Sequence, residues 1–166
     1  MGVLLETVRR YGRNYPGLPV IDRKIHGHVA RLTVVGALSR NGLGALMTLE
    51  GGMTGDAFAS YLEHILIPSL HPGQTVVMDN LSAHKVGPIR KLIEDAGCYL
   101  LYLPPYSPDL NPIEFAWSFI KRHIEGTRCP SQCDFDALLM KEVSLISSTI
   151  ATAWITKCGY RLRSRF

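Results

Sequence analysis

The feature that most constrains the fold is an alternation of strand and helix signals in the second half of the chain. The signals are, in order, a strand at 75–78, a helix at 85–96, a strand at 98–103 and a helix from 111 to about 124. Helical crossovers between strands produce parallel neighbours in a sheet. The pattern therefore predicts an α/β fold with a mixed sheet flanked by helices.

The flanking segments extend this pattern on both sides. β-rich residues at 31–38 and 43–49 are joined through Asn41-Gly42, which predicts a β-hairpin. Apolar residues at helical spacing over 58–66 predict a helix that Pro68 ends, and residues 134–150 predict a further helix. No internal repeat or low-complexity tract interrupts this order.

Two carboxylates occupy informative positions in the predicted elements. Asp79 follows the strand at 75–78, and Glu114 falls in the first turn of a helix that Asn111 would cap and Pro112 would begin. The 34 residues between the two acids suffice for a strand–helix–strand path that returns the chain to the same sheet edge. Two carboxylates there repel unless cations such as Mg²⁺ bind them. Alternatively, Asp79 belongs to a turn and Glu114 interacts only with the helix dipole.

Composition sets broader limits. With 166 residues, 46% hydrophobic and 19% charged, the chain suits one globular domain, not a disordered one. A net charge of +4 is compatible with a nucleic-acid partner but is weak evidence for one. The start shows no signal peptide, and the apolar runs fall short of the ~20 residues that cross a bilayer. We therefore expect a cytoplasmic protein without a membrane partner.

The four cysteines, Cys98, Cys129, Cys133 and Cys158, fit reduced thiols. Cys129 and Cys133 have the spacing of half a zinc site, but His123 is the only further ligand nearby. Ordinary free thiols are the favoured interpretation.

Two segments carry a family resemblance. VVMDNLSAHK (76–85) and LLYLPPYSPDLNPIEFAWSFIK (100–121) resemble the DDE transposases of the mariner-like superfamily, in its bacterial insertion-sequence branch. The resemblance implies a ribonuclease-H-like fold and a Mg²⁺ or Mn²⁺ centre held by Asp79 and Glu114, with two metals in the intact family. The implied reaction is cleavage of double-stranded DNA at transposon ends, followed by strand transfer to target DNA. The implied partners are DNA and a second subunit, as a homodimer or an assembly with an intact transposase.

The family also has a first catalytic aspartate on the first, central strand, and that residue is not evident in this sequence. The register of Arg9-Arg10-Tyr11-Gly12-Arg13 would place it at or just before Met1, and Glu6 and Asp22 fit poorly. We expect an N-terminally truncated chain whose first central strand is missing or replaced, with residues 2–7 as a partial substitute. Exposed strand edges would follow. Such a chain would be inactive alone, so its status as an enzyme is open.

The remaining site predictions have structural alternatives. Asn80, His84 and Asn111 could support the two acids or simply form turns and caps. Candidate contacts to DNA phosphates are basic residues for which ordinary solvated charges are the alternative; these are Arg9, Arg10, Arg13, Lys85, Arg90, Lys121 and Arg122. We divide the chain into a basic arm (1–24), the catalytic domain (25–160) and a basic tail (161–166).

Two other functions compete with that of a catalytic domain. One is a non-catalytic fragment that binds DNA or a transposase subunit and modulates the intact enzyme. The other is a different ribonuclease-H-like nuclease, such as a resolvase, which the NPIE motif and the interval before it disfavour.

Overall fold

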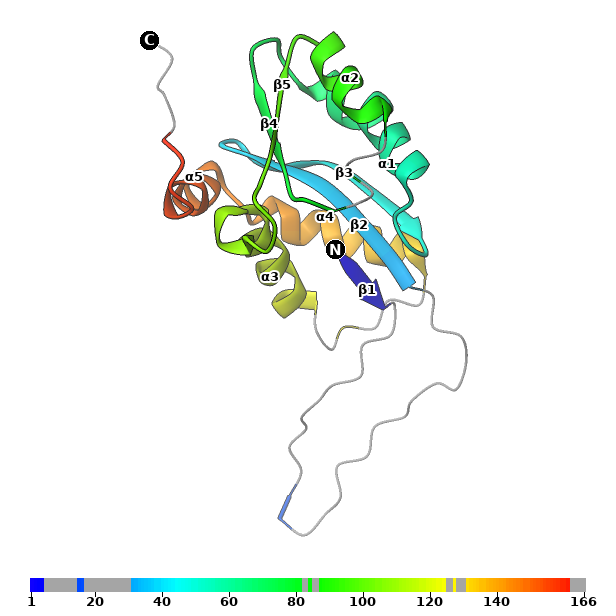
Figure 1. The fold of residues 1–166 in the computed structure, drawn as a ribbon. Helices are drawn as coiled ribbons and strands as arrows, with labels where there is room; N and C mark the ends of the chain where they lie inside the picture. Colours follow the sequence, from blue (N-terminus) through cyan, green and yellow to red (C-terminus); the bar gives the residue numbers. More distant parts are fainter. Residues whose placement is uncertain are drawn as a thin grey trace.

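The computed structural model describes residues 1–4, 15–16, 31–81, 84, 87–124, 127 and 131–161. An antiparallel sheet has the order β1-β2-β3, formed by β1 (Gly2–Leu4), β2 (Arg31–Ser39) and β3 (Gly42–Glu50) (Figure 1). The predicted hairpin is confirmed, with Ser39 pairing with Gly42 across the turn. Gly42 has φ +122°, a backbone conformation that favours glycine.

A second, parallel sheet contains β4 (Thr75–Met78) and β5 (Tyr99–Tyr102). The connection between them includes helix α2 (Pro88–Asp95), as the alternation of signals predicted. In the register of this sheet Met78 pairs with Tyr102. Asp79 therefore leaves β4 at its carboxyl end, the edge where α/β folds place their sites.

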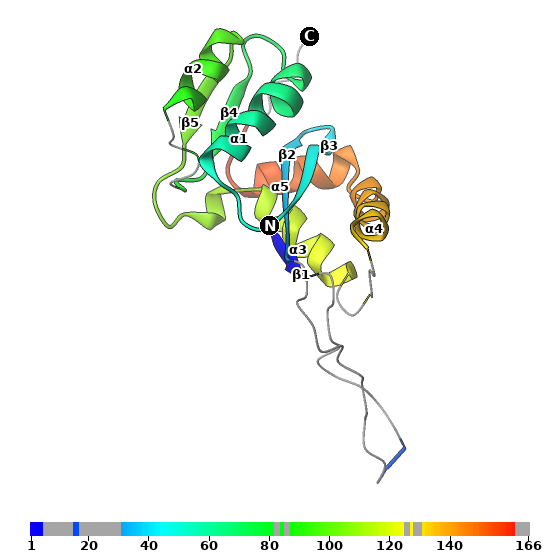
Figure 2. The ribbon, with the colours of Figure 1, turned by 90° about the vertical axis from the view of Figure 1, so that its right-hand side faces the viewer.

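One side of both sheets is covered by α2 and by a helical run that follows β3 (Figure 2). The run comprises α1 (Gly55–Tyr61), a π-helical turn η1 (Leu62–Leu66) and a 3-10 turn η2 (Ile67–Ser69). The Thr54 hydroxyl caps α1 by accepting from the Ala57 amide at 3.2 Å. Pro68 lies inside η2, so the run ends one residue later than predicted. Phe58, Tyr61 and Leu62 are buried in this layer.

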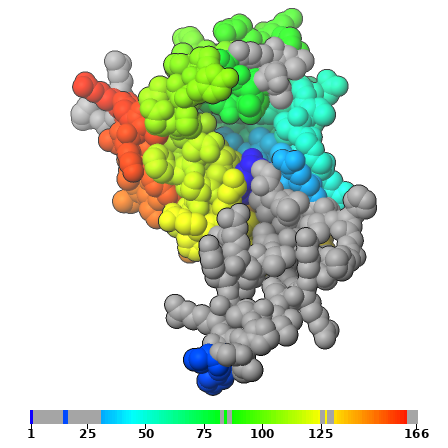
Figure 3. Space-filling view, turned by 60° about the horizontal axis from the view of Figure 1, so that its bottom comes forward, coloured from blue at the N-terminus to red at the C-terminus, as the bar shows by residue number. Residues whose placement is uncertain are grey.

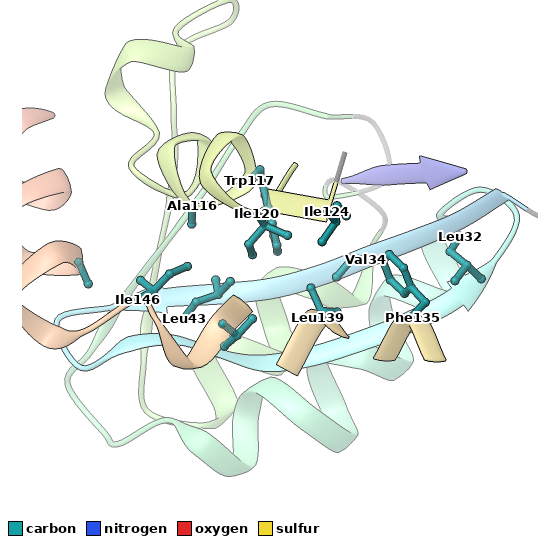
Figure 4. Packing of buried hydrophobic residues seen from close by; sticks show 12 residues of the cluster. Leu32, Val34, Leu43, Ala116, Trp117, Ile120, Ile124, Phe135, Leu139 and Ile146 are labelled. Atoms are coloured by element: carbon teal, nitrogen blue, oxygen red, sulfur yellow. The ribbon is translucent and has the colours of Figure 1, made fainter. Parts of the chain in front are cut away.

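The other side of β2 and β3 is covered by α3 (Ile113–Ile124), α4 (Gln132–Ser144) and α5 (Ser148–Lys157). Helix α3 presents one apolar stripe to the sheet, because Ala116, Trp117, Ile120 and Ile124 recur at helical spacing (Figure 4). Strand alternation directs Leu32 and Val34 to this layer. Neighbouring residues of β2 face the α1 layer instead.

The single helix predicted over 134–150 is wrong: α4 and α5 are separate helices that meet at 77°. The break follows from Ser147, whose hydroxyl accepts from the Ile150 amide at 3.4 Å and begins a new helix. Within the described residues, no single helix is long and apolar enough to cross a membrane, and only this bent pair passes that test jointly.

A short first strand is present, since β1 pairs antiparallel with Arg31–Thr33. Met1 continues the ladder: its amino group donates to the Val34 carbonyl, and the Val34 amide donates to the Met1 carbonyl, both at 2.7 Å. The hairpin therefore has a neighbour over its first residues, formed by part of the segment 2–7 that we expected as a substitute. Most of the predicted arm, and the tail beyond Arg161, lie outside the described residues.

Candidate active site

Asp79 lies immediately after β4, as predicted. The Leu81 amide donates to its Oδ1 at 3.3 Å, and His84 Nδ1 lies 2.6 Å from the same oxygen. Burial raises the pKa of Asp79, but the contact with His84, the charge of His84 and the Leu81 amide outweigh burial, and the pKa lies below its ordinary value. The carboxylate is thus held in its charged form, with its side chain 37% exposed.

His84 is fixed by two residues that the sequence analysis did not identify. Its ring lies against Phe58, with centroids 4.2 Å apart, and the Tyr102 hydroxyl donates to its backbone carbonyl at 2.5 Å. Nδ1 is buried, and within the described part of the chain its polar contact is the ion pair with Asp79, not a well-aligned hydrogen bond. No short-range signal could have found Phe58 and Tyr102, because both contacts depend on the tertiary fold.

Glu114 occupies the first turn of α3, also as predicted. The turn before it is the 3-10 helix η4 (Pro108–Leu110), and Asn111 then adopts an extended conformation. The Glu114 amide donates to the Asn111 carbonyl at 3.1 Å. The side-chain cap predicted for Asn111 is not observed among the hydrogen bonds of the described residues. The main chain of Asn111, not its side chain, starts the helix that carries exposed Glu114.

The start of β1 connects the two acids. The negative charges of Glu114 and Asp79 both raise the pKa of the Met1 amino group, whereas burial and then the charge of Lys121 lower it, and the net shift is downward. The charges of Asp79, Glu114 and Lys121 therefore all act on the Met1 amino group. Figure 3 shows β1 in dark blue between α3 in yellow and β2 in light blue.

The other predicted residues are less closely tied to this point. Asn80 is half-buried beside Asp79. Arg90 on α2 pairs with Glu94 at 3.2 Å and lies 5.8 Å from the Tyr102 ring centroid. Arg122 is exposed, and its Nε donates to the Ser118 carbonyl at 3.3 Å. Arg9, Arg10, Arg13 and Lys85 lie outside the described residues.

No cluster of three or more His, Cys, Asp or Glu side chains that could hold a metal ion occurs within the part of the chain that the structure describes. Cys98 and Cys158 are buried free thiols, and Cys133 is an exposed one. Cys129 lies outside the described residues, so the half zinc site is not tested. The candidate oxygen ligands for a metal are Asp79, at the carboxyl end of β4, and Glu114, in the first turn of α3.

The chain is similar to known proteins over most of its length. The model of the DDE superfamily endonuclease family matches residues 1–136. The Tcb1 transposase of Caenorhabditis briggsae, a transposable-element protein, is 30% identical over 99 residues, which cover 57% of this chain and 36% of that protein.

Solved structures of Mos1 transposase share the fold. The Mos1 paired-end complex with the left transposon end matches with a TM-score of 0.74 and 14% identity, over 95% of this chain and 50% of that one. The catalytic domain of Mos1 matches with a TM-score of 0.57 and 15% identity, over 81% and 76% of the two chains. The α/β, ribonuclease-H-like prediction is thus confirmed. The chain spans about half the length of the Mos1 chains in the DNA complexes and about a third of Tcb1.

The family match covers β1 through the start of α4, and therefore includes both carboxylates, strand β4 before Asp79 and helix α3, which carries Glu114. It also begins at residue 1, within the segment that we separated as an arm. Because the family model matches most of its length, this chain belongs to the DDE superfamily endonuclease family.

Proposed function

We propose that this chain carries the catalytic domain of a DNA transposase, which cleaves DNA and joins the cut strand to a target. The observation that carries the proposal is that Asp79, at the carboxyl end of β4, and Glu114, in the first turn of α3, both lie close enough to the Met1 amino group for their charges to raise its pKa. Membership of the DDE superfamily endonuclease family supports it, as do relatives that are themselves transposases. The solved Mos1 complexes contain transposon-end DNA, and one is a strand-transfer complex.

The donor set fits a divalent metal. Both acids supply hard oxygen atoms, the ligands that Mg²⁺ and Mn²⁺ prefer. Protein donors contact Oδ1 of Asp79 and leave Oδ2 without a partner among the described residues. Mos1 complexes have been solved with Mg and with Mn. When bound by Asp79 and Glu114, a pair of such ions would activate an attacking oxygen and stabilise a leaving oxygen of a phosphodiester.

Lys121 is the basic residue best placed to position DNA. It is exposed on α3, two helical turns after Glu114, and its charge acts on the same Met1 amino group as the two carboxylates. A lysine there would contact a phosphate beside the scissile bond and offset the negative charge of the backbone. Arg122, on the same helix, is a second candidate for such a contact.

A third carboxylate at or just before Met1 would complete the set. The start of β1 supports this position, because Met1, the residue before the strand, pairs with Val34 and its amino group is affected by the charges of both acids. We propose that the chain belongs to the bacterial insertion-sequence branch of the transposases, and that Asp79 and Glu114 do not suffice for activity without a third carboxylate. We also propose that it acts on DNA in the cytoplasm as a homodimer or with intact subunits.

The test extends the chain at its start. Three proteins are made, each with a short apolar strand added before Met1 and with Asp at one of the three positions that precede Met1. Each protein is incubated with Mg²⁺ or Mn²⁺ and a plasmid carrying the DNA that borders the coding sequence. We expect nicking from one extended protein, none from the matching Asn protein, and none from the chain itself above an Asp79→Ala control. Inactivity of all the extended proteins, without metal binding, would contradict the proposal.

A second candidate is a non-catalytic fragment that modulates an intact transposase by binding DNA or its subunits. It is favoured by the absence of a three-acid cluster within the described part of the chain. Mixing the chain with an intact transposase would then reduce strand transfer even when both carboxylates are replaced by amides. If the chain acts only through its own carboxylates, this amide variant should not reduce strand transfer.

A further inference from the structure

We propose that His84 is a positioning residue, which holds the carboxylate of Asp79 in one orientation so that its Oδ2 is presented to a metal ion. This inference deepens the proposed function and rests on it. It begins with the polar contacts of the carboxylate: the Leu81 amide donates to Oδ1 at 3.3 Å, and His84 Nδ1 forms an ion pair with the same oxygen at 2.6 Å. Among the described residues, no donor contacts Oδ2.

His84 can serve this purpose because it is itself fixed. Its side chain is 17% exposed, against 37% for that of Asp79. The ring rests on Phe58, which is 4% exposed and belongs to the cluster under α1. Packing on a buried ring limits the rotation of an imidazole.

The backbone of His84 is tied to the strand beside Asp79. Tyr102 donates to its carbonyl at 2.5 Å, and Tyr102 pairs with Met78, the residue before Asp79. Asp79 and His84 are therefore both tied to the same pair of residues in the parallel sheet, Met78 and Tyr102. The ring of His84 packs against α1, and its backbone is bonded to β5. The Asp79 carboxylate that contacts His84 therefore has little freedom to rotate.

A fixed carboxylate binds a metal ion more tightly than a rotating one, because less side-chain freedom is lost on binding. Groups that orient metal ligands typically change metal affinity by about 10- to 100-fold when they are removed. In the opposite role, His84 would compete with a cation by occupying the Asp79 carboxylate itself. The two roles predict opposite effects of removing the imidazole.

The experiment measures Mn²⁺ binding by electron paramagnetic resonance for the whole chain and for three variants of His84. In Asn the amide nitrogen takes the place of Nδ1, whereas in Gln it takes the place of Nε2. We expect His84→Ala and His84→Gln to weaken binding by about 10-fold, and His84→Asn to restore most of it. Unchanged or tighter binding by His84→Ala, or equal behaviour of the Asn and Gln variants, would overturn the proposal.

A second readout does not depend on the metal. The NMR couplings of the Asp79 β-protons report whether χ1 occupies one rotamer. We expect one rotamer in the wild type and in His84→Asn, and averaging in His84→Ala and His84→Gln. If no Mn²⁺ binds in a manner that Asp79→Asn removes, the proposed metal site fails. The couplings then decide the orienting role alone, and a single rotamer in His84→Ala refutes it.

Discussion

The indole of Trp117 on α3 lies against the backbone of Gly36 on β2, where a β-carbon would sit 3.2 Å from its Cη2 atom. The same β-carbon would lie 2.7 Å from Leu46 Cδ2. Gly36 therefore allows the helix that carries Glu114 to approach the sheet. We expect Gly36→Ala to reduce the free energy of unfolding by about 1–3 kcal/mol through overpacking, as measured by urea denaturation.

Gly44→Ala is the matched control for this prediction. Gly44 lies on the neighbouring strand β3, and a β-carbon there would meet nothing within 4 Å. Gly44→Ala should therefore reduce the free energy of unfolding less than Gly36→Ala does. Equal losses for the two variants would mean that contact with Trp117 does not determine the distance between α3 and the sheet.

Local patterns were enough to predict most of the elements. The turn residues Asn41 and Gly42 and the alternation of residues along β2 identify the hairpin without tertiary information. The boundary between α4 and α5 was missed because residues 134–150 keep an apolar pattern across it. The capping by Ser147 is a short-range effect, but a serine in a helix can also point to solvent, so its identity alone does not mark a break.

The site could be predicted only in part, for a related reason. Positions after a strand and in a first helical turn placed Asp79 and Glu114 correctly on their elements. The support of His84 by Phe58 and Tyr102 depends on segments that come together only in the folded chain. Residues 1–24 were predicted to form an arm in which 2–7 only partly replaces a strand, because a three-residue strand has too few residues to show a period of two.

Tyr61 gives a prediction about buried hydroxyl groups. It is 2% exposed, and its hydroxyl has no hydrogen-bond partner within the described residues, so burial raises its pKa far above the ordinary value. Removing an unpaired buried hydroxyl costs little, and we expect Tyr61→Phe to change the free energy of unfolding by less than about 0.5 kcal/mol or to raise it.

Tyr160→Phe is the contrasting variant. The Tyr160 hydroxyl donates to the Leu110 carbonyl at 2.8 Å and so anchors the turn before Glu114. Loss of this hydrogen bond in Tyr160→Phe should reduce the free energy of unfolding by about 1 kcal/mol. Chemical denaturation of both variants tests the pair, and a larger loss for Tyr61→Phe would reveal a partner for its hydroxyl.

Asp79 predicts a dependence of stability on pH. Its pKa is lower in the folded protein than the ordinary value of 3.8, so the folded state binds its proton less readily than the unfolded state. The resulting stabilisation is complete above the unfolded pKa and is lost as pH falls through the folded pKa. The stability of the wild type should therefore fall more steeply below about pH 4 than that of Asp79→Asn.

Urea denaturation at several pH values compares these two proteins, with exposed Glu63→Gln as a control for the loss of one negative charge. The control should keep the acid dependence of the wild type more closely than Asp79→Asn does. Parallel curves for wild type and Asp79→Asn would show that His84 and Leu81 do not favour the charged carboxylate.

Ser147 gives the last prediction, which concerns the break between α4 and α5. Its hydroxyl accepts from the Ile150 amide and begins α5, whose Ala151 and Ile155 are buried. Ser147→Ala leaves that amide without its cap and should cost about 1 kcal/mol in urea denaturation. Ser148→Ala changes an exposed residue inside the first turn and is the control. If Ser147→Ala is no less stable than this control, buried apolar contacts alone, and not capping, set where the chain turns.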